Sequence, residues 1–248
     1  LAERKEKIEN PKNMEEWCLA NVGREIYETF IEGYSSKQWA RHPRELPTSI
    51  IKRVPIRLTF NDNYFNDRYQ GIPIGGYTSI FEKMLEGIPI ELNTDFHLDR
   101  ETFLSKFDQV IFTGPIDSFF DYSVGHLEYR SLRFDHQLVN YSDYQGNAVI
   151  NHTESQIPYT RTYEHKHFDM NFSASKSAVT YEYPDKWEPG KIEIYPVNTD
   201  ENQSLFEKYQ SMANEVPNVT FGGRLGQYRY YDMHQVIASA LEKVKSLA

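Results

Sequence analysis

The stretch Val219-Thr220-Phe221-Gly222-Gly223-Arg224-Leu225-Gly226 decides the fold class of this 248-residue chain. It reads as a short strand that ends in a glycine pair, and a helix over 236–247 follows it closely. An earlier apolar run, Gln109-Val110-Ile111-Phe112-Thr113-Gly114, also ends in glycine, and helices are predicted over 79–86 and 100–107 with a short strand over 88–92. Helices that alternate with strands at this spacing predict an α/β layer.

The residues after the glycine pair have the composition of a ligand-contacting loop. Two arginines, three tyrosines and an aspartate are packed into 224–232, between the glycines and the final helix. Glycine lets the backbone approach a ligand closely, arginine offers a planar fork to phosphate, and a helix start favours anions. A plain strand-to-helix turn with a solvated charged face explains the same residues, and the loop alone does not decide between the two.

The middle of the chain has β character, whereas the first 32 residues are helical in character. Short aromatic and β-branched segments at 129–138, 148–151, 163–168 and 179–183 are separated by turn residues and predict an antiparallel sheet. Near the amino end, Asn13 is a plausible helix cap ahead of the apolar positions Trp17, Ala20, Ile26 and Phe30. The predicted fold class is therefore mixed α/β and α+β.

Composition limits the function classes. The formal net charge of −9 argues against a general nucleic-acid binder, although a local arginine group can still hold a phosphate. The single cysteine, Cys18, excludes an internal disulfide framework and fits a reducing compartment. No apolar run approaches the length of a membrane span, and the first residues lack the apolar centre of a signal peptide. We expect a soluble, cytoplasmic protein with no integral membrane segment.

Several residue pairs suggest other chemistry. His165 and His167 would face one side of a strand, which is a possible metal geometry, but no cysteine or carboxylate spacing completes a familiar site and we predict no metal. Asp117 and Asp121 could serve a glycosidase, although a pair at helical spacing is more often a solvated face. The sequence contains neither a G-x-S-x-G elbow nor a P-loop, which disfavours a serine hydrolase or a P-loop NTPase. Arginines stand in or beside extended segments at 53, 57, 130, 133, 161, 224 and 229, where several could neutralise a diphosphate.

Ordered blocks along almost the whole chain resemble the bacterial UDP-galactopyranose mutase family. They include Gly33-Tyr34-Ser35-Ser36-Lys37-Gln38-Trp39, Lys52-Arg53-Val54-Pro55-Ile56-Arg57, Gly71-Ile72-Pro73-Ile74-Gly75-Gly76-Tyr77-Thr78, Pro158-Tyr159-Thr160-Arg161, Glu164-His165-Lys166-His167-Phe168 and the Gly-Arg-Leu-Gly loop at 223–226. The resemblance implies an FAD-dependent isomerase, active with reduced flavin, that interconverts UDP-galactopyranose and UDP-galactofuranose through an adduct between flavin N5 and the sugar. The product would serve cell wall polysaccharide biosynthesis. A homodimer is left open.

Site roles follow from the resemblance, residue by residue. It implies that Arg53 and Arg161 clamp the diphosphate and stabilise the charge of departing UDP, while Asp232 lies near the sugar and flavin. The uridine-side positions are Phe30, Tyr34, Ser35 and Trp39; Asn151 matches a UDP contact; and Tyr64, Tyr195 and Tyr230 match tyrosines that bond to the diphosphate. The flavin-side positions are Gly223, Arg224, Met233 and, beside the active site, Arg130. Ser35 replaces a frequent threonine, and His234 replaces a frequent aspartate.

The family's amino-terminal G-x-G-x-x-G loop, which receives the FAD pyrophosphate, has no counterpart in the sequence. The chain therefore resembles the carboxyl-terminal two thirds of the family. The implied layout is the end of a helical domain at 1–30, a substrate-binding sheet domain at 31–72 and 122–196, and the second part of an FAD-binding domain at 73–121 and 197–248. On this layout we expect the chain alone to bind UDP weakly and FAD poorly and to be inactive.

Two alternative functions share much of this pattern. A non-catalytic UDP-sugar-binding fragment would keep every substrate residue and differ only in flavin occupancy. A relative of the flavin-dependent amine oxidases would share the α/β layer, the sheet and the glycine-rich loop, but it would not explain the 33–39 block or the positions of Arg53 and Arg161.

Overall fold

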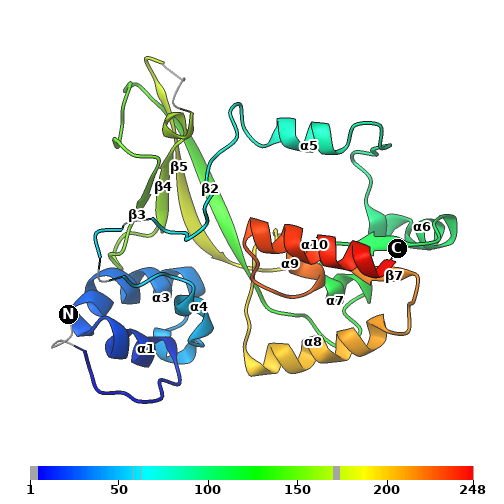
Figure 1. Ribbon diagram of the computed structural model, residues 1–248, viewed down its shortest axis with the longest axis horizontal. Coiled ribbons are helices and arrows are strands. Elements are labelled where there is room, and N and C mark those ends of the chain that lie inside the picture. Colours follow the sequence, from blue (N-terminus) through cyan, green and yellow to red (C-terminus); the bar gives the residue numbers. More distant parts are fainter. Residues whose placement is uncertain (1–4, 58, 62, 170–173, 248) are drawn as a thin grey trace. The chain divides into compact units, whose positions relative to one another are not determined.

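The computed structural model describes residues 5–57, 59–61, 63–169 and 174–247, which belong to two compact units (Figure 1). Unit 1 comprises Leu1–Ile90 and Leu132–Asp185, and unit 2 comprises Glu91–Ser131 and Lys186–Ala248. Among the described residues, no helix is both long and apolar enough to cross a membrane. The three-part domain layout implied by the resemblance stays a prediction.

Unit 1 begins with short helices. They are α1 (Met14–Asn21), α2 (Arg24–Ile26), the π-helical turn η2 (Tyr27–Glu32), α3 (Gly33–Trp39), the 3-10 turn η3 (Pro43–Glu45), α4 (Ser49–Lys52) and α5 (Thr78–Met84). The predicted cap is confirmed, because Asn13 Oδ1 accepts the backbone N–H of Glu16 at 2.9 Å. The buried side of α1 carries Met14, Cys18 and Leu19, whereas three of the predicted apolar positions, Trp17, Ala20 and Ile26, are half-buried. Phe30 is 59% exposed.

A five-stranded sheet follows in the strand order β3-β4-β5-β2-β6. Its strands are β2 (Tyr129–Val139), β3 (Val149–Asn151), β4 (Arg161–Glu164), β5 (Ser177–Lys186) and β6 (Tyr195–Pro196), and the 3-10 turn η5 (His165–Phe168) follows β4. The β3–β4 and β4–β5 pairs, which lie in unit 1, are antiparallel. The β2–β6 pair, which lies in unit 2, is antiparallel too. The predicted antiparallel sheet is therefore confirmed.

Unit 2 contains a two-stranded parallel sheet of β1 (Val110–Phe112) and β7 (Val219–Phe221). Its helices are η4 (Phe96–Leu98), α6 (Arg100–Lys106), α7 (Ile116–Phe119), α8 (Asp200–Ala213), α9 (Gly223–Gly226) and α10 (Met233–Leu247). Phe112, Phe119 and Val219 form one buried cluster, and a second cluster includes Tyr129 and Tyr209. Both glycine-terminated runs of the sequence are thus strands, and the structure pairs them in parallel within the predicted α/β layer.

Two sequence-based element predictions were wrong. The segment at 88–92 forms no strand, and its side chains are exposed. His165 and His167 lie in η5, so they do not share one side of a strand. The first difference has a physical reason, because a strand needs a hydrogen-bonding neighbour and an apolar run by itself does not supply one.

Candidate functional site

Three polar residues stand in one row across the sheet of unit 1. Asn151 on β3 pairs in register with Arg161 on β4, and Arg161 pairs with Glu182 on β5. Arg161 Nε donates to Asn151 Oδ1 at 3.1 Å, and Arg161 Nη1 lies 3.5 Å from Glu182 Oε2. Residues paired directly across antiparallel strands have side chains on the same face, so the register itself brings these three groups together.

Glu182 is the buried anchor of this row. It is only 2% exposed, and its carboxylate accepts hydrogen bonds from the Thr160 hydroxyl at 2.9 Å and from the Tyr163 hydroxyl. Burial, followed by the hydrogen bond to Glu182, raises the pKa of Tyr163 above its ordinary value. Burial alone would lower the pKa of Arg161, but its neighbours Tyr34 and Glu182 outweigh that effect and raise it. The guanidinium is therefore held in a fixed orientation as a permanent cation.

Helix α3 faces Arg161 from the helical part of unit 1. The Arg161 guanidinium lies over the Tyr34 ring, 5.8 Å from its centroid. Ser35 and Trp39 are buried on the same helix, at 5% and 8% exposure, whereas Phe30 lies on the preceding turn. The structure thus brings together Tyr34, Asn151 and Arg161 of the predicted substrate residues.

Arg53 and Tyr64, two further predicted substrate residues, each make a contact close by in the sequence. Arg53 follows α4, where its Nε donates to the carbonyl oxygen of Ile50 at 3.3 Å. Tyr64 is 47% exposed and packs edge-on against Phe65, with ring centroids 4.7 Å apart. The pairing of Arg53 with Arg161 as a diphosphate clamp therefore stays a prediction.

Unit 2 holds a second arginine and tyrosine cluster. The Arg224 guanidinium lies 5.1 Å from the Tyr230 ring centroid and 5.8 Å from that of Tyr195, and the two rings are 5.1 Å apart. Arg224 also donates to the carbonyl oxygens of Ile194, at 3.0 Å, and Tyr231. Buried Arg130 pairs with Tyr195 in the β2–β6 register. The structure therefore groups four residues that the resemblance assigned to the diphosphate and the flavin.

Glycines line the carboxyl ends of the parallel strands in unit 2. Gly223 has a φ of +74°, a conformation that side chains rarely adopt, and a Cβ on Gly226 would lie 3.0 Å from the carbonyl oxygen of Phe112. Asp232 donates its backbone N–H to Gln235 at the start of α10, and Met233 there is 67% exposed. The backbone is thus closely packed where α/β sheets usually bind nucleotides.

The aspartate pair considered for a glycosidase is structural. Asp117 is fully buried, and its carboxylate accepts the Leu127 N–H at 2.9 Å and the Tyr129 hydroxyl at 3.3 Å. Burial raises its pKa, and these hydrogen bonds oppose that effect. Asp121 forms an ion pair with Arg100 at 2.8 Å. Neither the glycosidase interpretation nor that of a solvated face describes Asp117.

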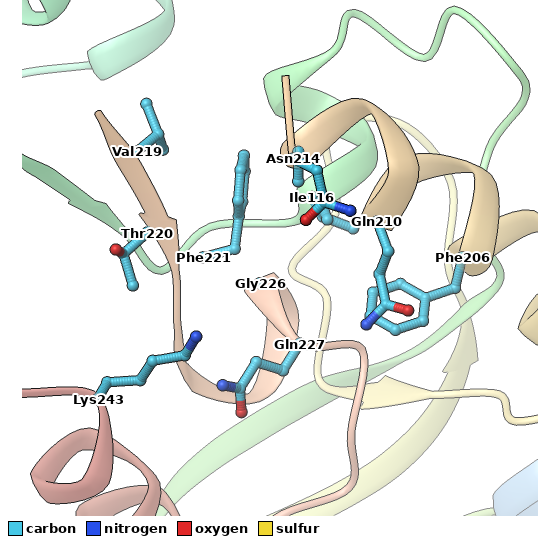
Figure 2. A pocket seen from close by; sticks show the side chains of 11 residues that line it. Ile116, Phe206, Gln210, Asn214, Val219, Thr220, Phe221, Gly226, Gln227 and Lys243 are labelled. Atoms are coloured by element: carbon cyan, nitrogen blue, oxygen red, sulfur yellow. The ribbon is translucent and has the colours of Figure 1, made fainter. Parts of the chain in front are cut away.

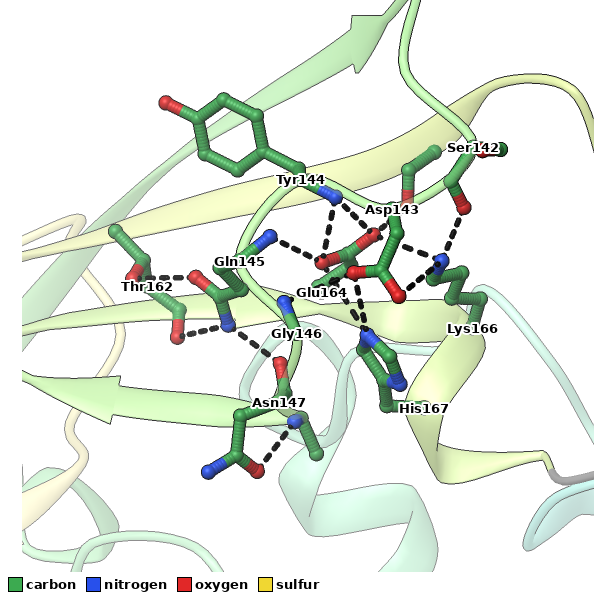
Figure 3. Close-up of polar contacts among 12 residues, drawn as sticks. Ser142, Asp143, Tyr144, Gln145, Gly146, Asn147, Thr162, Glu164, Lys166 and His167 are labelled. Carbon is green, nitrogen blue, oxygen red and sulfur yellow. Dashed lines mark hydrogen bonds and ion pairs between the residues drawn. The ribbon is translucent and has the colours of Figure 1, made fainter.

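An ionic cluster lies where β4 ends (Figure 3). One ligand atom each from Asp143, Glu164 and His167 lies within 4.8 Å of the others, a grouping that could hold a metal ion. The Lys166 ammonium, however, is 3.2 Å from Asp143 and 3.5 Å from Glu164. Glu164 also accepts hydrogen bonds from the Ser177 hydroxyl and from the backbone N–H groups of residues 144 and 145. With a cation already present and the carboxylate saturated, the cluster fits a structural role better than a metal site.

A hollow of about 400 Å³ in unit 2 is lined by α8, β7 and the segment after α9 (Figure 2). Gln210, Asn214, Gln227 and Lys243 contribute its polar side chains. Its described lining includes none of the residues predicted to bind substrate or flavin. The residues that line this hollow therefore give no support for substrate or flavin binding in it.

Sequence reasoning missed Glu182 and Tyr163 as neighbours of Arg161. A glutamate inside the aromatic run at 179–183 was a signal, because a charged residue rarely occupies a buried strand position without a partner. Only the strand register shows that this partner is Arg161.

Comparisons with known proteins show the family of this chain. The sequence profile of the family described as "UDP-galactopyranose mutase" matches residues 29–230. The chain is 43% identical over 237 residues to a "Probable UDP-galactopyranose mutase" of Klebsiella pneumoniae, covering 95% of this chain and 61% of that protein. It is 39% identical over 241 residues to a "dTDP-fucopyranose mutase" of Escherichia coli, covering 95% and 64%.

The fold agrees with a solved structure. A crystal structure of reduced UDP-galactopyranose mutase matches with a TM-score of 0.69 at 16% identity, covering all of this chain and 70% of that one. The chain spans less than two thirds of the length of the two curated relatives named above. Since the family profile covers most of its residues, the chain belongs to the UDP-galactopyranose mutase family.

Proposed function

We propose that this chain provides the nucleotide-sugar-binding part of a flavin-dependent mutase that interconverts UDP-galactopyranose and UDP-galactofuranose for cell-surface galactofuranose synthesis. The observation that carries the proposal is the Asn151, Arg161 and Glu182 row, with the Arg161 guanidinium over the ring of Tyr34. A fixed guanidinium fork suits a diphosphate, and a neighbouring aromatic ring suits a base or a sugar.

In this proposal Arg161 binds the diphosphate and stabilises the negative charge that grows on UDP as the bond to the sugar breaks. Glu182 and Asn151 keep the fork oriented, so that little reorganisation accompanies the reaction. Tyr34, Ser35, Trp39 and Phe30 would lie on the uridine side. In unit 2, the resemblance gives the hydroxyl groups of Tyr195 and Tyr230 to a diphosphate, and the Arg224 guanidinium lies near both rings.

The glycine-lined ends of β1 and β7 fit one side of a flavin nucleotide. Gly114 and Gly222 follow two adjacent parallel strands. Gly223, whose positive φ favours glycine, leaves the backbone at this edge uncovered by a side chain. Gly223, Arg224 and Met233 would hold this side, and Asp232 would lie near the sugar. When bound, reduced flavin would supply a nucleophilic nitrogen to the anomeric carbon.

A non-catalytic UDP-sugar-binding function is the second candidate. The same substrate residues support it, and the chain's coverage of 61% and 64% of its relatives favours testing binding before turnover. The dTDP-fucopyranose mutase among the relatives makes dTDP the informative competing nucleotide.

Calorimetric titration of the chain with UDP, dTDP and UMP tests the proposal. We expect UDP to bind more tightly than UMP, and Arg161→Lys, which keeps the charge but loses the fork, to weaken UDP binding about tenfold. Arg68→Ala, which removes an exposed arginine of the same unit, is the matched control and should bind UDP as the parent chain does. Equal affinity of Arg161→Lys and the parent chain for UDP would refute the assignment of Arg161, and a preference for dTDP would change the substrate.

A further inference from the structure

The ammonium of Lys37 on α3 is surrounded by four backbone carbonyl groups of one loop. Lys37 Nζ donates to the carbonyl oxygens of His152, Glu154, Ile157 and Tyr159 at 2.8, 2.9, 3.0 and 3.1 Å. An ammonium has three N–H donors, so the four oxygens share them. All four belong to the segment at 152–160 that joins β3 to β4.

Gly33 provides a second contact between α3 and the same loop. It lies one turn before Lys37, and side chains four residues apart lie on one face of a helix. A Cβ on Gly33 would be 2.3 Å from the carbonyl oxygen of Thr153 and 3.3 Å from the backbone nitrogen of Ser155. The loop therefore rests directly on the helix backbone at Gly33 and is held by a charged side chain at Lys37.

The arrangement of the loop depends on positive charge. Four carbonyl oxygens directed at one point repel one another through their partial negative charges, and a cation among them converts that repulsion into attraction. Without the ammonium these oxygens, which are part-buried except for that of Glu154, would have to find water or other donors, and leaving them unsatisfied would cost free energy. A neutral side chain of similar size cannot replace Lys37 in this role.

The loop connects two of the residues in the Arg161 row. It begins directly after Asn151 and ends directly before Arg161, and the bond from His152 N–H to the Thr160 carbonyl at 2.9 Å closes its neck. Tyr34, whose ring lies under Arg161, is the neighbour of Gly33 on α3. Fixing the loop on α3 therefore sets the position of Arg161 relative to Tyr34.

We infer that Lys37 is a positioning residue for the nucleotide-sugar site, because its ammonium organises the loop at 152–160 and thereby aligns Asn151 and Arg161 with Tyr34. The link to substrate binding rests on the proposed function, whereas the link to loop order does not. The two links are separated by measuring loop order and UDP affinity in the same variants.

The test uses Lys37→Ala, Lys37→Met and the control Lys12→Ala, which removes an exposed lysine of the same unit. Amide hydrogen exchange at 152–160 and the UDP dissociation constant are measured with and without n-propylammonium, which replaces the atoms lost in Lys37→Ala. Tetramethylammonium, a cation without N–H donors, serves as the salt control. If Lys37→Ala does not fold, Lys37→Met, which fills the space without the charge, still reports loop exchange and UDP affinity.

We expect both Lys37 variants to exchange the loop amides at least about tenfold faster and to bind UDP about tenfold more weakly. n-Propylammonium should restore Lys37→Ala but not Lys37→Met, and tetramethylammonium should restore neither. Unchanged exchange in a folded variant, failure of n-propylammonium to restore folded Lys37→Ala, or faster exchange with unchanged UDP affinity would each overturn the inference. A parent chain that binds no UDP would refute the proposed function instead, and exchange and rescue would then decide the loop role alone.

Discussion

Arg161 shows how neighbouring residues turn a common side chain into a binding group. Its fork is oriented by Asn151 at 3.1 Å and by Glu182 at 3.5 Å, and Glu182 is itself fixed by Thr160 and Tyr163. An exposed arginine samples many rotamers, and ordering it on binding costs free energy. Here that cost is met during folding, so Arg161 can bind a diphosphate with little further loss of entropy.

Glu164 gives a residue-scale prediction about acid stability. Burial alone would raise its pKa, but bonds from the Ser177 hydroxyl and the N–H groups of residues 144 and 145, with the nearby Lys166, lower it to about 2. The unfolded-state value is about 4.3, so the carboxylate stabilises the fold fully above that pH and the effect is lost as pH falls toward 2. We expect Glu164→Gln to lower the free energy of unfolding by about 1–3 kcal/mol at pH 7.

Urea unfolding at pH 7, 5 and 3.5 checks this prediction. The difference between parent and Glu164→Gln should shrink toward pH 3.5, whereas exposed Glu86→Gln should match the parent throughout. A constant difference across this range would contradict the assigned role of the carboxylate.

At the scale of elements, the sequence predicted helices and strands correctly where a capping or turn residue marks their end, and less well where only an apolar run suggests them. The Asn13 cap and the two strands that end in glycine were predictable because their signals are local. The strand predicted at 88–92 was wrong, because a strand forms only where another strand pairs with it and the local sequence does not show whether one does. Of the strand predicted over 163–168, the first two residues lie in β4 and the rest form the turn η5.

The α1 cap gives a prediction at this scale. Asn13 accepts the Glu16 N–H at 2.9 Å, and its Nδ2 donates back to the Glu16 carboxylate at 3.1 Å. We expect Asn13→Ala to lower the free energy of unfolding by about 1 kcal/mol, and Asn13→Ser, which can still cap, to recover most of it. Chemical unfolding followed by circular dichroism measures both, with exposed Asn10→Ala as control. Equal losses in Asn13→Ala and Asn13→Ser would show that the cap does not stabilise α1.

At the scale of the whole molecule, the net charge and the share of its relatives' length that the chain covers both bear on the proposed function. The chain carries a formal charge of −9, so an anionic ligand must be attracted by local groups such as Arg161 against the overall field. It spans 61% and 64% of two mutase relatives, and its described residues belong to two units, each with its own arginine and tyrosine cluster.

Ligand linkage provides the whole-molecule prediction. UDP at 100 times its dissociation constant should raise the free energy of unfolding by about 2.7 kcal/mol. Hydrogen exchange should slow at 151–163 in unit 1 more than in α8 of unit 2. At the same UDP concentration, Arg161→Lys, which binds about tenfold more weakly, should gain only about 1.4 kcal/mol. Equal protection in the parent chain and Arg161→Lys would place the bound nucleotide elsewhere.

The sequence by itself determined the family and the mixed α/β character and supplied the residue types proposed for the site, because ordered motifs, glycine-terminated strands and capping signals lie in short contiguous stretches. Only the tertiary structure decided which of those residues meet. Asn151, Arg161 and Glu182 stand on three separate strands and become neighbours through strand register. Lys37 meets its four carbonyl groups through the packing of α3 against a loop more than a hundred residues away. Register and packing depend on the balance of all contacts in the folded unit, which no local stretch of sequence contains.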